Sequence, residues 1–187
     1  DSGDRKLWAA SLLLASVSEA CVSYDCAWAF ELAYVMRDAL RRMYEATGEH
    51  PDGENIFYYL TVYNEPYPQP AEPSDFPGGT AALEEGILRG LYLYSAGSSD
   101  GLPDDAPRVQ LLASGVGMAW ALEAQELLRN DWNVVADVWS VTSWNELRRD
   151  GLRCDEAAFL HPETEAPVPW VTRQLAGRPG PVVAVSD

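Results

Sequence analysis

The hydrophobic positions of the first third of the chain follow a helical repeat and then a strand-like run. After Tyr24-Asp25 the apolar side chains recur at helical spacing, at Trp28, Leu32, Val35, Ala39 and Met43. Charged residues lie off this stripe: Glu31, Arg37, Asp38, Arg41 and Arg42. We therefore predict a long amphipathic helix with Asp25 as its N-cap. The loop 48–53 ends it, and the aromatic run 55–63 predicts a strand buried on both faces.

The second half of the chain alternates strand and helix patterns. Apolar runs predict strands at 91–94, 108–113, 133–141 and 181–185, the last of a buried type. A turn at 114–117 opens a helix, and we expect one of its faces to carry Val116, Trp120, Ala124, Leu127 and Leu128. Ser143 and Glu146 predict a capping box at the start of a further helix. A short helix is expected around 170–175.

A proline-rich bridge separates these two blocks. Residues 66–79 hold five prolines and two glycines in fourteen positions, a density that no helix or central strand tolerates. Strands alternating with crossover helices indicate a parallel sheet covered on both faces. The predicted fold class is α/β, a three-layer α/β/α arrangement with mostly parallel sheets.

Composition narrows the possible partners. The 187 residues carry 29 Asp+Glu against 13 Lys+Arg, a formal net charge of −16, which argues against nucleic acid and against an anionic membrane surface. The apolar stretch 7–17 is too short to cross a bilayer. Three cysteines without zinc-ligand spacing favour a reducing, cytoplasmic setting.

Two motifs have both a chemical and a structural interpretation. The run from Ser114 to Met118 follows a strand and opens a helix, where free N–H groups bind phosphate in a sugar or nucleotide binder. It lacks the third glycine of the dinucleotide fingerprint, so a tight turn is favoured. His161 could act as a base or metal ligand, but with no Cys or His at ligand spacing a capping or loop role is favoured. His50 is expected in solvent.

The cysteines offer no clear nucleophile. Cys21 and Cys26 flank the start of the predicted helix, and Asp25 lies next to Cys26. A reactive thiolate requires positive surroundings, so both are expected to be buried small hydrophobes. Taken by motif alone, the chain carries no complete catalytic constellation.

Several runs nevertheless resemble a known enzyme family. Residues 24–31 read YDCAWAFE, close to the run Y-D-P-A-[FY]-A-[FY]-E that is typical of the homodimeric pyruvate dehydrogenase E1 component, a thiamine-diphosphate enzyme of the transketolase superfamily. Cys26 departs from it, where the family has a proline. The resemblance continues at 58–65, 84–87 and 160–162, and it is strongest at 138–151 (VWSVTSWNELRRDG).

The resemblance implies a domain organisation. Residues 1–66 would be the C-terminal part of a pyrimidine-binding domain, 67–83 a linker, and 84–187 a transketolase C-terminal-like domain truncated at Asp187. It also implies thiamine diphosphate and Mg²⁺, held mainly by other E1-like chains or missing segments. A lipoyl or other carrier protein would be a further partner.

One family active-site run, Glu-Asp-Gly-His-Ser, falls within the chain. Counted back from Tyr24 it meets residues 7–11, so that the Asp position is Trp8 and the His position is Ala10, followed by Ser11. An indole and a methyl group cannot transfer the proton that the histidine handles. Trp8, Ala10 and Ser11 are therefore expected to line the substrate side of a pocket without a complete catalytic set.

Two functions follow from the resemblance. The first is a divergent subunit or fragment of an E1-like enzyme that decarboxylates a 2-oxo acid and transfers a two-carbon unit to a lipoyl group or a small metabolite, and that is not catalytic alone. The second is a non-catalytic assembly subunit whose active-site segment has decayed.

Overall fold

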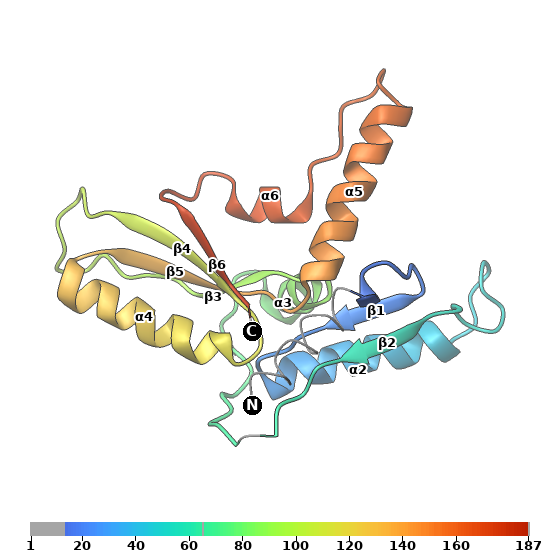
Figure 1. The fold of residues 1–187 in the computed structure, drawn as a ribbon, viewed down its shortest axis with the longest axis horizontal. Helices are drawn as coiled ribbons and strands as arrows, with labels where there is room; N and C mark the ends of the chain where they lie inside the picture. The colour runs from blue at the N-terminus through green and yellow to red at the C-terminus, as the bar shows by residue number, and fades with distance from the viewer. Residues whose placement is uncertain (1–13, 65, 187) are drawn as a thin grey trace.

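Two sheets form the framework of the computed structural model, which describes residues 14–64 and 66–186 (Figure 1). The smaller sheet pairs β1 (Cys21–Tyr24) in parallel with β2 (Phe57–Leu60). The larger one has the order β3-β5-β4-β6 and comprises β3 (Tyr92–Ser95), β4 (Arg108–Ala113), β5 (Val135–Ser140) and β6 (Val182–Val185). Strand β4 runs parallel to β5 and β6, whereas β3 is antiparallel to β5. The predicted mostly parallel α/β fold is confirmed.

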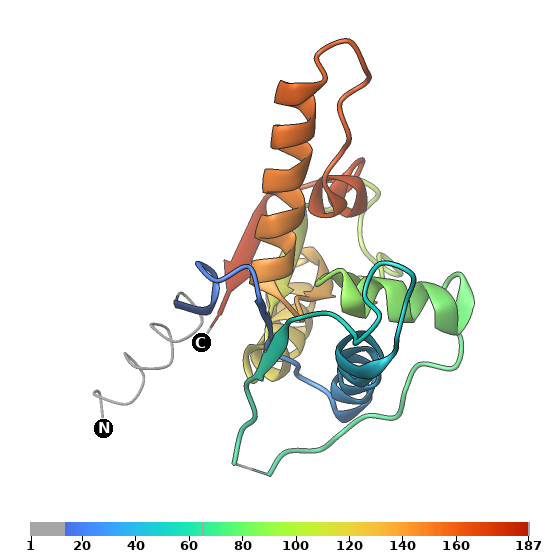
Figure 2. The ribbon, with the colours of Figure 1, turned by 90° about the vertical axis from the view of Figure 1, so that its right-hand side faces the viewer.

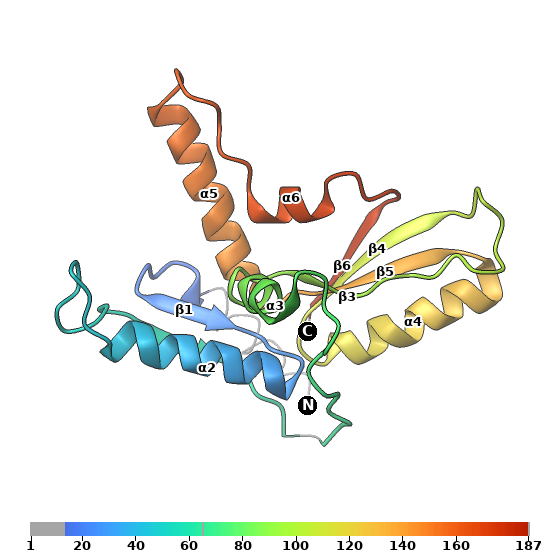
Figure 3. The same cartoon turned by 180° about the vertical axis from the view of Figure 1, so that it is seen from behind.

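Five helices pack around the described sheets. They are α2 (Ala29–Tyr44), α3 (Gly79–Leu88), α4 (Gly117–Trp132), α5 (Trp144–Leu160) and α6 (Trp170–Leu175). Helices α2 and α3 lie beside the small sheet, and α5 projects steeply away from the rest of the chain (Figures 2 and 3). No described helix is long and apolar enough to cross a membrane.

The larger sheet is the middle of three layers. Side chains alternate along a strand, so Val109, Leu111 and Ala113 pack towards α4 while Leu112 packs towards α6. Strand β5 divides in the same way, with Val138 facing α4 and the fully buried Trp139 facing α6. This alternation produces the predicted α/β/α layering.

The small sheet shares its core with the second half of the chain. Val22 and Tyr24 of β1 pack with Val35 of α2, and the same cluster includes Ile87 of α3 and Tyr92 of β3. The helical stripe predicted for α2 is thus confirmed at its centre, where Val35 and Ala39 are buried.

Three details of the first block differ from the predictions. The first residue before α2 is Trp28, so Asp25 is not the N-cap. The strand predicted at 55–63 is confined to β2, which pairs on one edge only and is exposed or half-buried. Strand β1 was not predicted, because four residues with a Cys and a Ser give too weak a pattern.

The second block also departs from its pattern. On α4 the buried residues are Gly117, Met118 and Ala121, whereas Trp120 is 62% exposed and Leu127 is 51% exposed. Ala124 and Leu128 of the predicted face do pack against the core, so the prediction holds in part and the buried face is rotated towards Met118 and Ala121. The capping box is half formed, since Ser143 Oγ accepts from the Glu146 amide but the Glu146 carboxylate pairs with Arg149.

The linker and the last strand complete the comparison. Residues 66–78 contain no helix or strand in their described part, as predicted, but α3 begins at Gly79, so the last positions assigned to the linker are helical. Strand β6 forms where predicted, yet all four of its residues are exposed, because it is the outermost strand of the described sheet.

Gly180 allows β6 to reach the sheet. Its φ is +92°, and a Cβ there would overlap the carbonyl oxygen of Arg108 at the start of β4.

We expect Gly180→Ala to lower the free energy of unfolding by about 3 kcal/mol, measured by urea denaturation. Gly177→Ala is the matched control, because Gly177 also has a left-handed φ (+72°) but open space around it. Gly177→Ala should lower the free energy of unfolding by about 1 kcal/mol. Equal losses in the two variants would contradict the claim that Gly180 is required by its close approach to the Arg108 carbonyl.

Candidate functional site

The residues predicted to line the substrate side, Trp8, Ala10 and Ser11, lie outside the described residues. The structure therefore tests neither their placement nor their role. The described residues present three parts of interest: a polar cluster at the ends of the parallel strands, a buried carboxylate between the two blocks, and a pocket beside α5.

The polar cluster gathers around Asp25. Asp25 follows β1 directly, Thr61 follows β2, and Gly115 lies just after β4, so the carboxyl ends of three strands meet here. Asp25 is 6% exposed, and its Oδ1 accepts hydrogen bonds from the hydroxyls of Thr61 and Tyr63, the latter at 3.0 Å. Its backbone completes the junction, since Asp25 N–H donates to Thr142 O (2.8 Å). In α/β folds this edge is where ligands bind.

A pocket of about 330 Å³ opens next to this cluster. Its walls include Cys26, Trp28, Thr61, Tyr63 and Tyr67. They offer aromatic surface and hydroxyl groups suited to a planar, mostly apolar group. The Cys26 thiol is a poor nucleophile, because burial and the nearby carboxylates of Glu31 and Asp25 raise its pKa well above the ordinary value. This lining can bind a ligand, and the hydroxyls of Tyr63 and Tyr67 already donate to Asp25 Oδ1 and Ala27 O.

The turn at 114–118 is a packed connection. Gly115 N–H donates to Asp25 O (3.2 Å), Gly117 N–H to Ser114 O (3.0 Å) and Met118 N–H to Gly115 O (3.2 Å). Gly115 has a φ of +50°, and a Cβ there would collide with the Tyr63 hydroxyl and the Asp25 carboxylate. Because these amides already have acceptors, the structure agrees with the tight-turn interpretation.

Glu31 is the buried carboxylate between the blocks. Its exposure is 0%, although its sequence pattern placed it off the apolar stripe of α2. Oε2 accepts from the amides of Ala27 (2.8 Å) and Trp28 (3.0 Å) and so caps α2, the role predicted for Asp25. Oε1 accepts from Tyr92 Oη (2.7 Å) on β3 and Ser140 Oγ (2.6 Å) on β5.

These four donors offset the cost of burial. Burial raises the pKa of the Glu31 carboxyl, while the bonds from Ser140, Tyr92 and the two amides lower it. Every acceptor position of the carboxylate is directed at a named protein donor, so none is left for a substrate. Glu31 is therefore a structural group that joins α2 to the larger sheet.

The histidines and cysteines take the structural roles expected of them. His50 lies in an exposed loop, and His161 ends α5 through its backbone N–H, which donates to Ala157 O (2.9 Å). Cys21 and Cys26 are buried, and all three thiols are free. Within residues 14–64 and 66–186, no group of three or more His, Cys, Asp or Glu side chains is placed to hold a metal ion.

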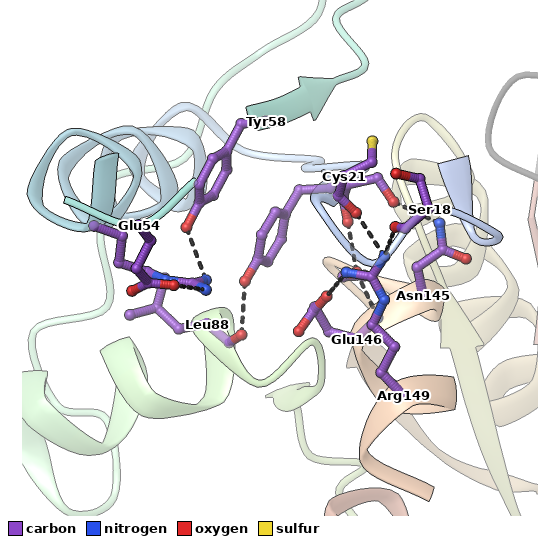
Figure 4. Close-up of polar contacts among 12 residues, drawn as sticks. Ser18, Cys21, Glu54, Tyr58, Leu88, Asn145, Glu146 and Arg149 are labelled. Atoms are coloured by element: carbon purple, nitrogen blue, oxygen red, sulfur yellow. Dashed lines mark hydrogen bonds and ion pairs between the residues drawn. The ribbon is translucent and has the colours of Figure 1, made fainter. Parts of the chain in front are cut away.

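The third part is a pocket of about 630 Å³ in the corner between α5 and the start of β1. Ser16, Val17 and Glu19 form one wall, and Arg149 and Arg153 are among the α5 residues that form the other. Arg149 lies between Glu146 and the backbone of residues 18–21, as Figure 4 shows.

Comparison with known proteins identifies this architecture. Residues 3–70 match the pyruvate dehydrogenase E1 component middle domain, and residues 90–187 match the transketolase-like C-terminal domain. The pyruvate dehydrogenase E1 components of Mycobacterium tuberculosis and Mycolicibacterium smegmatis are each 50% identical to the chain over 177 residues, 95% of its length. The chain belongs to the pyruvate dehydrogenase E1 component family. The Escherichia coli K12 protein is 41% identical over 168 residues, 89% of the chain.

The chain represents a limited part of these E1 components. It spans about 17% of the length of each of these three relatives. The two family matches end and begin on either side of residues 71–89, which hold most of the proline-rich bridge and α3. The domain boundaries at residues 66 and 84 stay predictions. The hydrogen bond between Tyr92 and Glu31 packs the two matched regions together, so the fold itself does not mark a boundary between them.

Sequence reasoning missed Glu31 and Arg149 as organising residues. Both were visible as charged residues in regular helices, and the family run YDCAWAFE contains Glu31. Two of the partners of Glu31, Tyr92 and Ser140, are 61 and 109 positions away from it in the sequence. No local sequence pattern can indicate contacts between residues so far apart in the chain, so this site is recognised only in the folded structure.

Two Glu31 variants should separate the contribution of the side chain's volume to stability from the contribution of its hydrogen bonds. Glu31→Ala leaves four buried donors without an acceptor and should lower the free energy of unfolding by about 3–4 kcal/mol. Glu31→Gln should cost about 1–2 kcal/mol, since its oxygen still accepts from the two amides and the hydroxyls of Tyr92 and Ser140 can turn to accept from its NH₂.

Urea denaturation measures both variants. Glu85→Ala on α3 is the control, because the half-exposed Glu85–Arg89 pair (2.9 Å) is expected to contribute less than about 1 kcal/mol. Equal losses for Glu31→Ala and Glu85→Ala would contradict the structural role of Glu31.

Proposed function

We propose that the chain is a divergent subunit or fragment of a thiamine-diphosphate-dependent, E1-like pyruvate dehydrogenase. In this function the assembled enzyme decarboxylates a 2-oxo acid and transfers the two-carbon unit to a lipoyl group or to a small-metabolite acceptor. The observation that carries the proposal is the Glu31 junction, which joins the part matching the E1 middle domain to the part matching the C-terminal domain. The junction holds these two parts of the chain together.

The cofactor would be held mainly by other chains or segments. Thiamine diphosphate requires a divalent cation and a diphosphate site, and the described residues do not fit either: they lack a cluster of metal-ligating side chains, and the amides of Gly115, Gly117 and Met118 already donate to protein acceptors. We therefore assign Mg²⁺ and the diphosphate to partner E1-like chains or to segments outside this sequence. A cytoplasmic setting is supported by the three free thiols.

The substrate side is where this chain would differ from its relatives. Trp8 and Ala10 replace an acid and an imidazole of the family run, and Ser11 is retained. An indole wall and a missing imidazole favour a bulkier or less polar acceptor over ordinary lipoyl transfer. The acceptor, and with it any lipoyl or carrier partner, is part of the proposal.

A non-catalytic assembly subunit is the second candidate. It is favoured by the same losses at Trp8 and Ala10, and by the saturation of the Glu31 carboxylate with protein donors. Reconstitution with and without the chain separates the two functions. Loss of turnover with the assembly intact supports the catalytic function, whereas collapse of the assembly in native mass spectrometry supports the structural one. A lone monomer, with no thiamine diphosphate retained by material from cells, would contradict both.

Variants at the family run test whether this segment lines a working site. We expect Ala10→His alone not to restore pyruvate dehydrogenase activity, because the neighbouring carboxylate position is also lost. Trp8→Asp with Ala10→His should raise the rate at least about tenfold, since together they regain an acid–base group and its electrostatic partner. The measurement is pyruvate decarboxylation by the reconstituted complex with an artificial electron acceptor.

Trp8→Asp with Ala9→His is the matched control. It adds the same two side chains with the imidazole one residue early, and it should stay at the level of the unmodified chain. Full recovery of pyruvate dehydrogenase activity with Ala10→His alone would refute the claim that both side chains must be restored together. No response to any variant, with the assembly intact, would remove these residues from the active site and favour the assembly function.

A further inference from the structure

The 330 Å³ pocket beside Asp25 combines aromatic walls with a lack of positive charge. Trp28 and Tyr67 both line it, with ring centres 6.1 Å apart and ring planes inclined at 58°, and Tyr63 contributes a third ring. No Lys, Arg or His is among the described residues of the lining. The face of an aromatic ring has a negative electrostatic potential, so such walls attract a cation when no cationic side chain competes for them.

Two buried carboxylates lie directly behind these walls. Asp25 is 6% exposed, and it accepts hydrogen bonds from the hydroxyls of two lining residues, Thr61 and Tyr63. Glu31 is fully buried and accepts from the backbone amides of two further lining residues. Both carboxylates are therefore one hydrogen bond away from the surface of the pocket.

Neither carboxylate has a cationic partner in the described part of the chain. The ion pairs formed there by Arg and His side chains involve other acids. The wall of the pocket experiences this negative charge, because burial first and then Glu31 and Asp25 raise the pKa of the lining Cys26 thiol. Buried charges are normally paired, so a cation in the pocket would stabilise both carboxylates. Shape alone suits any apolar group, but the surrounding charge favours a cation.

Trp28 adds a second requirement. Its side chain is 5% exposed, and its Nε1–H is buried without an acceptor among the residues that the structure describes. A buried donor that lacks an acceptor is costly. A ligand that brings an oxygen atom to this wall would therefore gain a hydrogen bond in addition to its electrostatic attraction.

We propose that this pocket binds a small quaternary ammonium compound that carries a hydroxyl or carbonyl oxygen. The ammonium group lies against the rings of Trp28 and Tyr67, and its charge compensates the carboxylates of Asp25 and Glu31. Aromatic walls are the usual means by which proteins recognise quaternary ammonium groups. This inference goes beyond the proposed function, because it assigns a ligand to the chain without requiring a reaction.

Calorimetric titration of the 187-residue chain with choline chloride, at constant ionic strength, tests the proposal. We expect a Kd of about 1 mM or lower. The matched ligand is 3,3-dimethylbutan-1-ol, which has the shape and hydroxyl of choline but a neutral carbon in place of the nitrogen. It should bind at least about tenfold more weakly. Equal affinity for the two ligands, or no choline binding up to about 10 mM, would overturn the proposal.

Two further ligands test the chemistry of the site. Ethyltrimethylammonium lacks the hydroxyl and should bind about threefold more weakly than choline, whereas equal binding would contradict the role of the Trp28 Nε1–H. Thiamine should not displace choline. Displacement would contradict the proposal, because the pocket would then take a thiazolium ring instead of an ammonium compound.

Variants of Tyr67 test the aromatic wall without changing the buried core. Tyr67→Leu should weaken choline binding at least about fivefold, whereas Tyr67→Phe keeps the ring and should stay within about twofold. Tyr44→Leu is the control, because Tyr44 is 76% exposed and lies outside the pocket, and it should leave the affinity unchanged. Equal losses in Tyr67→Leu and Tyr67→Phe would contradict the role of the ring, since the hydroxyl contact with Ala27 O would then account for both.

Asp25→Asn tests the charge behind the wall. The amide oxygen still accepts from Thr61 and Tyr63, so the variant removes charge while the hydrogen bonds are kept. Choline binding should weaken about threefold to tenfold, and binding of 3,3-dimethylbutan-1-ol should not change. An equal change for both ligands in a variant with an unaltered circular dichroism spectrum would contradict charge compensation.

Discussion

The burial of one carboxylate, that of Glu31, constrains the packing of both halves of the chain. An ionised carboxylate removed from water is costly unless donors replace its hydration. Here two amides at the start of α2 and two hydroxyls from β3 and β5 provide them. The donors come from segments on both sides of the proline-rich bridge, so the carboxylate is satisfied only when the two blocks are docked in one orientation.

The rest of the junction follows from that docking. It brings the end of β1 beside the end of β5, where Asp25 N–H meets Thr142 O, and it places Ser143 and Arg149 along the free edge of β1. Trp28 then stacks on Tyr94 (5.4 Å between ring centres) within the core shared with α4. Apolar contacts supply the bulk of the stability, while the polar groups select the orientation.

Sequence patterns predicted the parts of this structure that depend on local order. Local apolar patterns were enough to predict α2, the strands β4 and β5 and the short helix α6. Asp25 was misassigned as a cap because its partners Thr61 and Tyr63 are more than 35 residues away. Trp120 and Leu127 match a helical period, but their exposure depends on which face α4 turns to the sheet. The family resemblance was reached through short runs, and the comparisons support it over most of the chain.

Native-state hydrogen exchange as a function of urea most directly tests the claim that Glu31 makes the two blocks one cooperative unit. In the unmodified chain, the slowest amides of α2 around Val35 and of β5 around Val138 should merge into one unfolding isotherm with a common free energy. In Glu31→Ala the two isotherms should separate, with α2 opening at lower urea. Separate isotherms in the unmodified chain, or a single one that persists in Glu31→Ala, would contradict the account.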